Sequence, residues 1–420
     1  MDRRGFLFAG GGLAAAAAGL TACSSGSGSG SGGGSDRPLQ FLQSGDANQG
    51  GGYAAMAAKY QQQTGVKVEV VEVPNDDLDT KLRNAAQAND LPALARAGSI
   101  DPTWKDATVD LAPISDAYQI DKTLSAVDED GKVLSLPSDL TAVGLFLNKS
   151  LFAKAKVDYP ATADQTWTWD ECVAAIKKVQ QRTSTRYGMV MDRSSHRLKA
   201  MLFEFGSDYF NAGANGTFTT NNRTGAALDY FKSLNDDRFM PRSVWLSDAD
   251  GNALFKSGDV VAYYSGCWQI ADFAENIKDF DWVSTTVPKQ PVRTTNYGNA
   301  ASMVVFDGDQ SDAALKFLDW MYKPENYTTL AETSGFLPVV PNLDVRYRSN
   351  QDAFALYNAE IAASAPIVAE QNKLSFGYQI KGLAPDGDPV RDETVKFLND
   401  EQGLDKTISN ICTQFTQSLS

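Results

Sequence analysis

Residue types and motifs on which many enzyme and metal sites depend are scarce in this 420-residue chain. His196 is its single histidine, which excludes any catalytic or metal site that needs two. The sequence contains no G-x-S-x-G nucleophile elbow, no G-x-x-x-x-G-K-S/T phosphate loop and no H-E-x-x-H motif. It also has no run of 18 strongly apolar residues, so we expect no membrane-spanning helix in the folded body.

Positive charge is in the minority, because 38 Lys and Arg residues face 52 Asp and Glu residues, giving a net charge of −14. This balance argues against a general affinity for nucleic acid or anionic membranes. The 43% hydrophobic and 21% charged content is that of a globular protein. A chain of this length is more than one compact core usually fills, so we expect two lobes.

The N-terminus reads as an export signal rather than as part of the fold. Arg3-Arg4-Gly5-Phe6-Leu7 resembles the twin-arginine pattern, although Asp2 stands where Ser or Thr is usual. A weakly apolar stretch then leads to Leu20-Thr21-Ala22-Cys23, which resembles the bacterial lipobox. We therefore expect a signal peptide over 1–22 and a lipid on Cys23. The alternative is an ordinary signal with a chance cysteine.

Residues 24–35 are all Ser or Gly, which predicts a flexible tether spanning roughly 20 Å. A tether directly after a lipidated cysteine would let a folded body move near the membrane that holds the acyl chains. We assign 23–36 to this anchor and tether. The predicted location is the outer face of the cytoplasmic membrane, as in a lipoprotein of Gram-positive type.

Three further cysteines lie in the body of the chain: Cys172, Cys267 and Cys412. Cys172 and Cys412 fall on the apolar faces of predicted helices, where cysteine behaves as a small hydrophobic residue. A Cys172–Cys412 disulfide is an open alternative outside the cell. There is no C-x-x-C or zinc spacing, and we expect neither a metal nor a cofactor.

The body of the chain alternates between strand-like and helix-like segments. The first five are predicted as strand Leu39–Leu42, a helix through Tyr53 and Tyr60 that stops at Gly65, strand Val66–Val70, helix Asp77–Ala88 and strand Ala93–Ala97. This order is the signature of a parallel α/β sheet.

Later segments carry clear boundary signals. Asp130-Gly131 favours a hairpin turn, and a strand is expected over Ala142–Leu147. Thr168-Trp169-Asp170-Glu171 is a capping box that opens a helix. Another helix carries an apolar stripe from Ala314 to Tyr322 and is closed by Pro324.

One acidic stretch has some features of a calcium loop. Asp248, Asp250, Asn252 and Asp259 stand at offsets 1, 3, 5 and 12. Ala253 replaces the glycine that the sharp turn needs, so a plain polar loop is the competing interpretation.

A series of short segments resembles, in order, the extracellular solute-binding proteins of the maltose-binding type. They are Gln61–Val70, Asp130–Pro137, Phe146–Phe152, Thr168–Glu171, Phe255–Ala262 with Gly266-Cys267-Trp268, Phe317–Met321, Pro324-Glu325 and Gly335–Pro338. Three positions depart from the family pattern: Ala93 after Pro92, Tyr297 before Gly298, and Cys267.

The resemblance implies an α/β fold of two lobes joined by crossing strands, with a ligand gripped between them by hinge closure. The implied first lobe is 37–142 plus 299–336, and the second is 143–298 plus 337–420. Ligand contacts should lie on loops at the carboxyl ends of the strands. A sugar needs aromatic faces for its CH groups and polar side chains for its hydroxyls.

Four candidate ligand residues follow from this placement in the first lobe and at the Gly-x-Trp element. Trp268 follows the matched Gly-x-Trp element, and its alternative is a core tryptophan. Asp46 lies in the Gly-rich loop after the first strand, where a solvated turn is equally favoured. Asp101 and Trp104 follow the third strand, with a capping aspartate and a packing tryptophan as their alternatives.

Four more candidates lie near the expected crossings. Asp139 and Thr141 precede the first crossing, where hydroxyl recognition competes with a turn role. His196 lies near the place where the family presents an aromatic residue to the sugar, although a lone histidine is more often structural. Tyr297 is expected either to stack on a sugar or to fill the lobe edge.

The favoured function is a monomeric, non-enzymatic sugar-binding lipoprotein that delivers its ligand, an oligosaccharide by preference, to the membrane permease of an ABC importer. A polyamine, peptide or phosphate ester as the solute is the second hypothesis. A secreted enzyme acting on polysaccharide is the third. A strongly anionic cleft would favour a polyamine.

Overall fold

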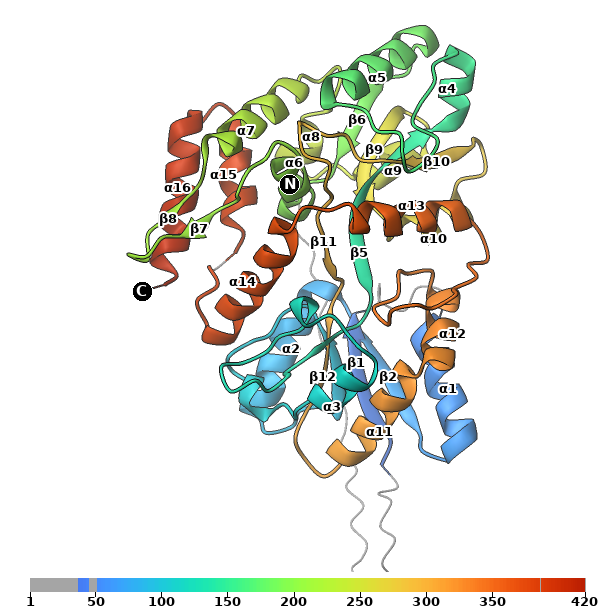
Figure 1. Ribbon diagram of the computed structural model, residues 1–420, viewed down its shortest axis with the longest axis vertical. Coiled ribbons are helices and arrows are strands. Elements are labelled where there is room, and N and C mark those ends of the chain that lie inside the picture. The colour runs from blue at the N-terminus through green and yellow to red at the C-terminus, as the bar shows by residue number, and fades with distance from the viewer. Residues whose placement is uncertain (1–36, 45–50, 386, 420) are drawn as a thin grey trace, which may run out of the picture. The chain divides into compact units, whose positions relative to one another are not determined.

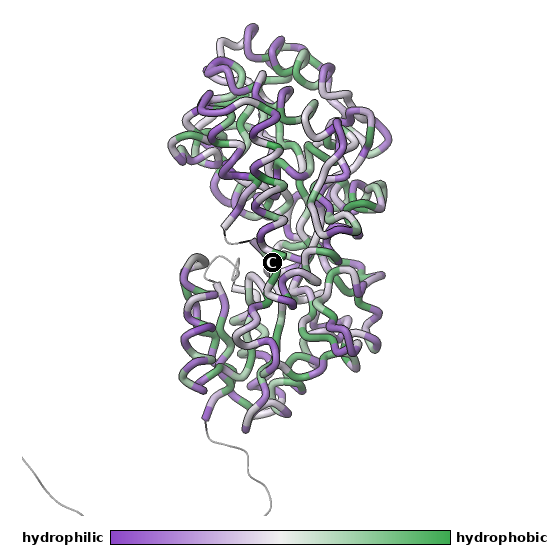
Figure 2. Tube along the Cα trace, turned by 90° about the vertical axis from the view of Figure 1, so that its left-hand side faces the viewer, coloured by the Kyte–Doolittle hydropathy of each residue, from purple (hydrophilic) through white to green (hydrophobic). Residues whose placement is uncertain are grey.

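Two β-sheets, one in each lobe, organise the chain (Figure 1). The structure is a computed structural model that describes residues 37–44, 51–385 and 387–419. Along the helices of both lobes, hydrophobic and hydrophilic residues alternate within each turn, as expected where one helix face packs on a sheet (Figure 2). The expected α/β fold with two lobes is confirmed.

The first lobe is built on a sheet with the strand order β2-β1-β3-β12-β4. Its strands are β1 (Leu39–Ser44), β2 (Val68–Val73), β3 (Leu94–Ala97), β4 (Leu136–Pro137) and β12 (Ser302–Val305). β1 runs parallel to β2 and β3, whereas β12 is antiparallel to β3 and β4. The helical segments of this lobe are α1 (Gly52–Thr64), α2 (Asn75–Gln87), η2 (Lys105–Ala107), α3 (Ala112–Ala117), η3 (Lys122–Leu124), α11 (Ser311–Tyr322) and α12 (Pro324–Ser334).

Alternation along β1 divides the first lobe's core into two layers. Leu39 and Phe41 pack in one cluster with side chains of α1 and α11, and Leu42 packs on the opposite face with side chains of α2. This is the period of two that a strand imposes on its side chains. Both faces are apolar because helices cover both sides of a largely parallel sheet.

The second lobe is built on a sheet with the order β10-β5-β9-β6, and β11 pairs with the first part of β5. The strands of this lobe are β5 (Leu140–Asn148), β6 (Tyr187–Met191), β9 (Val260–Gly266), β10 (Trp282–Thr285) and β11 (Tyr297–Asn299), with a separate pair, β7 (Asn211–Ala212) and β8 (Phe218–Thr219). β6 runs parallel to β9, and β5 is antiparallel to both β9 and β10.

Helices surround the second sheet. They are α4 (Lys149–Ala155), α5 (Trp169–Thr183), α6 (Ser195–Glu204), α7 (Asn222–Leu234), α8 (Ser243–Leu246), α9 (Gly251–Lys256), α10 (Gln269–Asn276), α13 (Gln351–Ala362), α14 (Ile367–Lys381), α15 (Pro389–Leu398) and α16 (Leu404–Gln417). Among the described residues, no helix is both long and apolar enough to span a bilayer.

Strand β5 connects the two sheets. Its first residues, Leu140 to Ala142, pair with β11, and the next five pair with β9. The Leu140 amide also donates a 2.9 Å hydrogen bond to the carbonyl of Leu337. Three segments that are distant in sequence thus lie side by side where the chain passes from one lobe to the other (Figure 1).

The boundary signals in the sequence are confirmed. Gly65 takes a left-handed φ of 78° and ends α1. Thr168 and Glu171 form both hydrogen bonds of the capping box at the start of α5. Gly131 has a φ of 84° in the predicted turn, and Pro324 follows α11 as the first residue of α12.

The sequence left open a Cys172–Cys412 disulfide and a calcium loop, and contacts in the structure decide between the alternatives in both cases. Cys172, Cys267 and Cys412 are free thiols, so the Cys172–Cys412 disulfide is not formed.

The calcium interpretation also fails. Asp248 pairs with Arg193 at 2.9 Å, and Asp250 caps α9 by accepting a hydrogen bond from the Ala253 amide. These carboxylates serve a salt bridge and a helix start, and the described residues contain no cluster of three potential metal ligands.

Helix α14 departs from the predicted lobe boundary. Phe376 and Ile380 pack into the first lobe's core beside α2, although 337–420 was assigned to the second lobe. The contact continues at the helix end, where Lys381 pairs with Glu129 at 2.8 Å. The first half of α14 stays with the second lobe, since Gln371 donates to Asn211. The helix therefore spans both lobes.

Glu204 is a carboxyl group buried inside the second lobe. It is fully enclosed, and it accepts 2.6 Å hydrogen bonds from the Trp169 indole and the Tyr264 hydroxyl. Burial raises its pKa to about 8, against the lowering effect of these two donors, and nearby Glu360 adds to the rise. The folded protein therefore holds a proton on Glu204 at neutral pH.

We predict that Glu204→Gln makes stability less dependent on pH. Because the folded-state pKa of Glu204 lies above its unfolded value of 4.5, its contribution is complete below pH 4.5 and is lost as pH rises toward 8. Between pH 5 and 8 the wild type should lose on the order of 2–4 kcal/mol through this group, whereas the glutamine variant should not. Unfolding midpoints at both pH values measure this, with the exposed Glu275→Gln as the control. Parallel pH profiles for wild type and Glu204→Gln would contradict the assignment.

Candidate functional site

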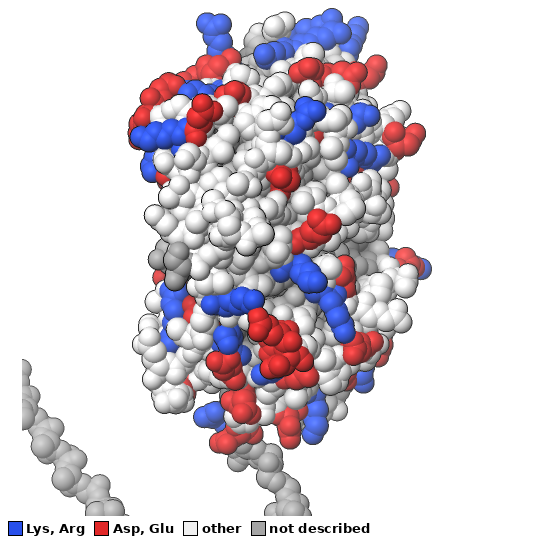
Figure 3. Space-filling view, turned by 60° about the vertical axis from the view of Figure 1, so that its left-hand side comes forward, with Lys and Arg blue, Asp and Glu red and all other residues white. Residues whose placement is uncertain are grey.

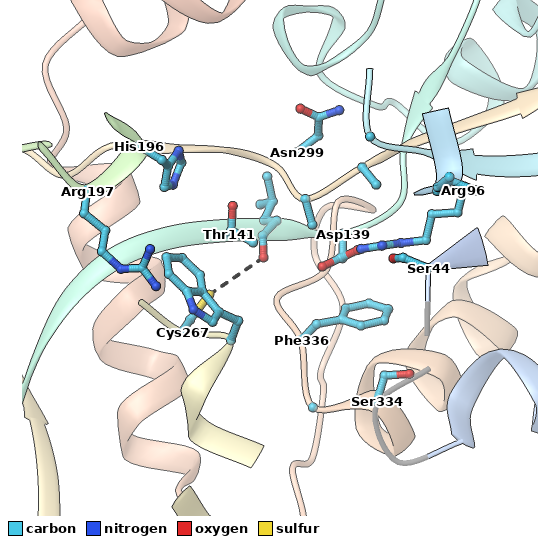
Figure 4. Close-up of a pocket in the computed structure, with 17 residues that line it drawn as sticks. Ser44, Arg96, Asp139, Thr141, His196, Arg197, Cys267, Asn299, Ser334 and Phe336 are labelled. Atoms are coloured by element: carbon cyan, nitrogen blue, oxygen red, sulfur yellow. Dashed lines mark hydrogen bonds and ion pairs between the residues drawn. The ribbon is translucent and has the colours of Figure 1, made fainter. Parts of the chain in front are cut away.

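A cavity of about 380 Å³ lies where the two lobes face each other (Figure 4). From the first lobe it is lined by residues at the carboxyl ends of the parallel strands β1 and β3, including Ser44 and Arg96. From the second lobe it is lined by residues that follow the parallel strands β6 and β9, including His196 and Trp268. Ligand sites in open α/β sheets lie at these strand ends.

The first-lobe side of the cavity contains a buried ion pair. Arg96 Nη2 lies 2.9 Å from Asp139 Oδ1, and Arg96 Nε donates to Ser138 Oγ at 3.0 Å. Ser138 in turn donates to the same carboxylate oxygen. The guanidinium and the carboxylate point toward each other in Figure 4. Because this ion pair is buried, separating its partners would leave an uncompensated charge. Both side chains are therefore held in this geometry.

Trp268 forms part of the opposite wall. The guanidinium carbon of Arg197 lies 5.0 Å from the centre of its ring, and the His196 ring lies 5.9 Å away. Gly266 permits this placement, since a Cβ there would lie 2.1 Å from the indole and 2.6 Å from the carbonyl oxygen of Ala142. The last glycine of β9 therefore sets the position of the tryptophan.

Cys267 is a structural residue in this wall. Its amide donates to the carbonyl of Ala142 at 3.0 Å, and its sulfur accepts from the Ala142 amide at 3.4 Å. Burial raises the pKa of the thiol to about 12, so the thiolate is not populated at neutral pH. The backbone and sulfur of Cys267 thus link the end of β9 to β5 through hydrogen bonds, and the thiol is unreactive.

The hydrogen bonds of His196 define its tautomer. The side-chain amide nitrogen of Asn296 donates to the His196 carbonyl at 2.9 Å and lies 3.0 Å from Nδ1. Nδ1 is therefore an acceptor, and the ring proton is on Nε2. Burial, aided by Arg197 and Lys199, lowers the pKa of this histidine to about 3. His196 is a neutral group whose Nε2–H has no hydrogen-bond partner among the described residues.

The lining of the cavity combines an aromatic ring with further unpaired polar atoms. Phe336 points into it from the segment after α12 (Figure 4). Within the part of the chain that the structure describes, Ser334 Oγ and Arg197 Nε are buried without hydrogen-bond partners, as is His196 Nε2. Buried polar groups are normally paired, so atoms left unpaired at a cavity wall are ready to bond a polar solute.

An adjoining cavity of about 250 Å³ shares His196 and Asn299 with the first. Lys199, Tyr209 and Tyr297 line it, together with residues from the first half of α14. Tyr297 is anchored through its backbone, because Asn372 donates to its carbonyl at 2.8 Å. Tyr297 lines this adjoining cavity and not the main one.

The structure brings four predicted ligand residues together. Asp139, Thr141, His196 and Trp268 all line the main cavity. Their predicted contact with a ligand stays a prediction, and Asp46 lies outside the described residues.

Asp101 and Trp104 do not line either cavity. Trp104 is 1% exposed and packs edge-on against Phe306, and Asp101 bonds Thr103 and Arg83. The structure therefore places Trp104 in the packing role that was its alternative, whereas Asp101 closes a local turn and pairs with Arg83 without capping a helix.

Several lining residues were not predicted from the sequence. Arg96 could have been predicted, because it lies inside the apolar strand Leu94–Ala97 and a charged residue is rarely buried without a partner. Phe336 lies in the matched Gly335–Pro338 segment, but nothing there distinguishes a cavity aromatic from a core one. Arg197 and Lys199 follow His196 on α6 and carried no local motif.

Two curated relatives have sequences similar to this chain. The lactose-binding protein of Rhizobium radiobacter is 25% identical over 201 residues, which cover 46% of this chain and 46% of the relative. The arabinooligosaccharide-binding protein of Halalkalibacterium halodurans is 23% identical over 272 residues, covering 60% and 59%. The chain spans between 46% and 62% of the length of the curated relatives it matches.

A solved structure confirms the fold. The cyclic alpha-maltosyl-1,6-maltose binding protein of Arthrobacter globiformis superposes with a TM-score of 0.71 at 22% identity, covering 91% of this chain and 99% of that one. The sequence profile of the bacterial extracellular solute-binding proteins matches residues 55–354. That match covers most of both lobes and the cavity between them, and the chain belongs to this family.

Proposed function

We propose that the protein is the sugar-binding component of an ABC importer and acts by closing its two lobes around a saccharide. The observation that carries this proposal is the lining of the cavity between the lobes. It offers the rings of Trp268 and Phe336 beside unpaired polar atoms of His196 and Ser334. Sugars are bound by this combination of aromatic faces and hydrogen-bonding groups. The relatives named for lactose and arabinooligosaccharides support the same solute class.

The crossing segments supply the hinge in this proposal. β5, β11 and the strand-like segment at Leu337 are the links at which the lobes would rotate. Ligand contacts from both lobes would stabilise the closed state, because only that state presents all of them at once. The closed lobes would then be the form that the permease recognises.

The charge of the cavity disfavours a polyamine. Asp139 is the single carboxylate among the described residues that line it, and it is already paired with Arg96. On the face shown in Figure 3, acidic and basic side chains lie interspersed above and below a largely uncharged region, so the chain's net negative charge forms no single acidic surface there. A cation such as a polyamine would find no free carboxylate among the described lining residues.

The same lining disfavours glycosidase chemistry, so we propose a binding protein without catalytic activity. Hydrolysis of a glycosidic bond generally uses two carboxyl groups that flank it. The described part of the cavity wall supplies one, engaged in an ion pair. The twin-arginine-like pattern, Cys23 and the Ser/Gly tether support a lipid-anchored protein at the outer face of the cytoplasmic membrane.

The proposal predicts stabilisation of the protein by one class of saccharide. A ligand present at about 100 times its Kd adds about 2.7 kcal/mol to the free energy of unfolding, which raises Tm by a few degrees. Thermal unfolding should be followed with mono-, di- and oligosaccharides, with polyamines and peptides as controls. A response to a polyamine or peptide alone would overturn the sugar assignment and keep the fold.

We predict that Gly266→Ala weakens ligand binding by about tenfold or more, because the added methyl group displaces Trp268 from the cavity wall. Tm should also fall, since the same Cβ meets the carbonyl of Ala142 on β5. Gly377→Ala in α14 is the matched control, because its Cβ would meet no atom within 4 Å. Calorimetric titration and thermal unfolding report the two effects. Equal affinity of Gly266→Ala and wild type would remove Trp268 from the site.

We predict that ligand affinity does not change between pH 5 and 7. The pKa of His196 is lowered to about 3, so the ring stays neutral and keeps its Nε2–H as a donor throughout this range. Since the chain has no other histidine, a titration step near pH 6.5 would be assigned to His196 and would contradict its buried, neutral state. His196→Ala should lower affinity about tenfold through the lost hydrogen bond.

A further inference from the structure

The adjoining cavity contains a cation, Lys199, that has no acidic partner among the described residues. Lys199 forms no ion pair or hydrogen bond among the described contacts, and its ammonium nitrogen lies 4.6 Å from the Tyr209 ring centre and 5.5 Å from that of Phe203. Burial lowers its pKa to about 8, and no carboxylate opposes that shift. Aromatic faces partly compensate a buried cation, but they do not neutralise its charge.

Positive charge gathers at the two cavities of an otherwise acidic protein. The described residues that line them include three cationic side chains, Arg96, Arg197 and Lys199, and one carboxylate, Asp139. Arg96 is paired with Asp139, and Arg197 is paired with Asp192 at 2.8 Å. Lys199 therefore carries the uncompensated charge, in a chain whose net charge is −14.

The position of these cations on α6 is unfavourable for the helix itself. Arg197 lies in its first turn beside the neutral His196, although the helix dipole favours acidic residues there and that turn contains none. Lys199 follows one turn after His196, on the same side of the helix. The helix dipole and the basic side chains add to one positive potential at the cavities. Basic side chains at this end of α6 lower the stability of the helix. Proteins retain such unfavourable arrangements mainly at functional sites, where a ligand interacts with them.

The backbone of Tyr209 has an unusual conformation beside Lys199. Its φ is 63°, a left-handed backbone conformation that is a genuine outlier for a bulky aromatic residue. Backbone strain of this kind persists where the surroundings enforce it and is concentrated at ligand sites. In this conformation the Tyr209 ring lies against the Lys199 ammonium and lines the adjoining cavity.

We propose that the saccharide ligand is acidic, and that Lys199 binds its oxyanion group in the adjoining cavity while neighbouring sugar rings occupy the main cavity. The inference rests on the proposed sugar-binding function and names the class of sugar. A carboxylate, sulfate or phosphate group would supply the same chemistry, namely a localised negative charge with several acceptor oxygens. Ser375 and Tyr297 line the same cavity with polar side chains that can add hydrogen bonds to those oxygens.

The test compares saccharides that differ only in the charged group. The probes are a disaccharide containing one uronic acid, the neutral parent disaccharide, and the sulfate and phosphate monoesters of that parent, with glycerol phosphate as an anion that is not a saccharide. Calorimetric titrations use the full chain and three variants, Lys199→Met, Lys199→Arg and Lys177→Met. Methionine preserves the aliphatic stem, arginine preserves the charge, and Lys177 is an exposed lysine on α5 that also packs on an aromatic ring, that of Phe239.

We expect at least one acidic probe to bind about 10–100-fold more tightly than the neutral parent, as for a charge-assisted hydrogen bond. Lys199→Met should abolish this preference, so that the acidic probes and the neutral parent bind the variant with affinities within about twofold of each other. Lys199→Arg and Lys177→Met should retain the preference. Which acidic probe binds most tightly identifies the oxyanion.

Failure of this inference is distinguishable from failure of the proposed function. Neutral saccharides that bind as tightly as the acidic ones, or a preference that survives in Lys199→Met, would overturn the acidic-ligand proposal and leave sugar binding intact. Binding of glycerol phosphate alone, through Lys199 and without any saccharide, would overturn the sugar assignment. Absence of binding by every saccharide, with normal thermal unfolding, would overturn both.

Discussion

The site depends on one constraint, which is that the backbone of β5 must be hydrogen-bonded at once to the crossing strand β11, to the segment at Leu337 and to β9 and β10. Its first residues pair with β11 and its later residues pair with β9 and β10. A buried backbone amide or carbonyl without a partner is costly, so the course of this strand is closely fixed. Asp139 precedes the strand, Thr141 lies on it, and Cys267 is bonded to Ala142. The geometry of the cavity therefore follows from a backbone requirement before any ligand is considered.

Paired charges make the lining of the cavities polar but nearly neutral. Two of its three cations have carboxylate partners, and the pairs hold Arg96 and Arg197 in place without leaving net charge. His196 adds a neutral donor whose tautomer is set by Asn296. Only Lys199 is left for a partner from outside the chain, as far as the described contacts show. A site that is polar but nearly balanced suits hydroxyl groups, and its one unbalanced charge adds discrimination among them.

The sequence was most informative where a local rule decided the structure. Gly65, the capping box at Thr168 and Pro324 each mark a helix boundary through short-range geometry, and each lies where it was expected. The α/β order and the two lobes followed from the alternation of segments and from family resemblance. Asp139 and Thr141 were expected from the strand crossing, and His196 and Trp268 from family resemblance; all four line the main cavity.

Side-chain direction and long-range docking were beyond these rules. Trp104 follows β3 as expected, but its ring turns into the core against Phe306, a choice that depends on tertiary packing. The sequence around Lys199 does not indicate its role, because that role depends on tertiary contacts: Tyr209 packs beside it, and no described carboxylate pairs with it. Helix α14 was assigned to one lobe because nothing in its own sequence indicates that Phe376 and Ile380 pack in the other.

The packing of α14 also governs the order in which the protein can assemble during synthesis. The apolar layer formed by Leu42 and Leu82 is completed by Phe376 and Ile380, which lie close to the end of the chain. A ribosome would have to synthesise the chain from Leu42 to at least Ile380 before that layer could close. Contacts between such distant segments carry a loop-closure cost and slow the approach to the native state. The first lobe, although made first, reaches its final form only when the C-terminal helices are available.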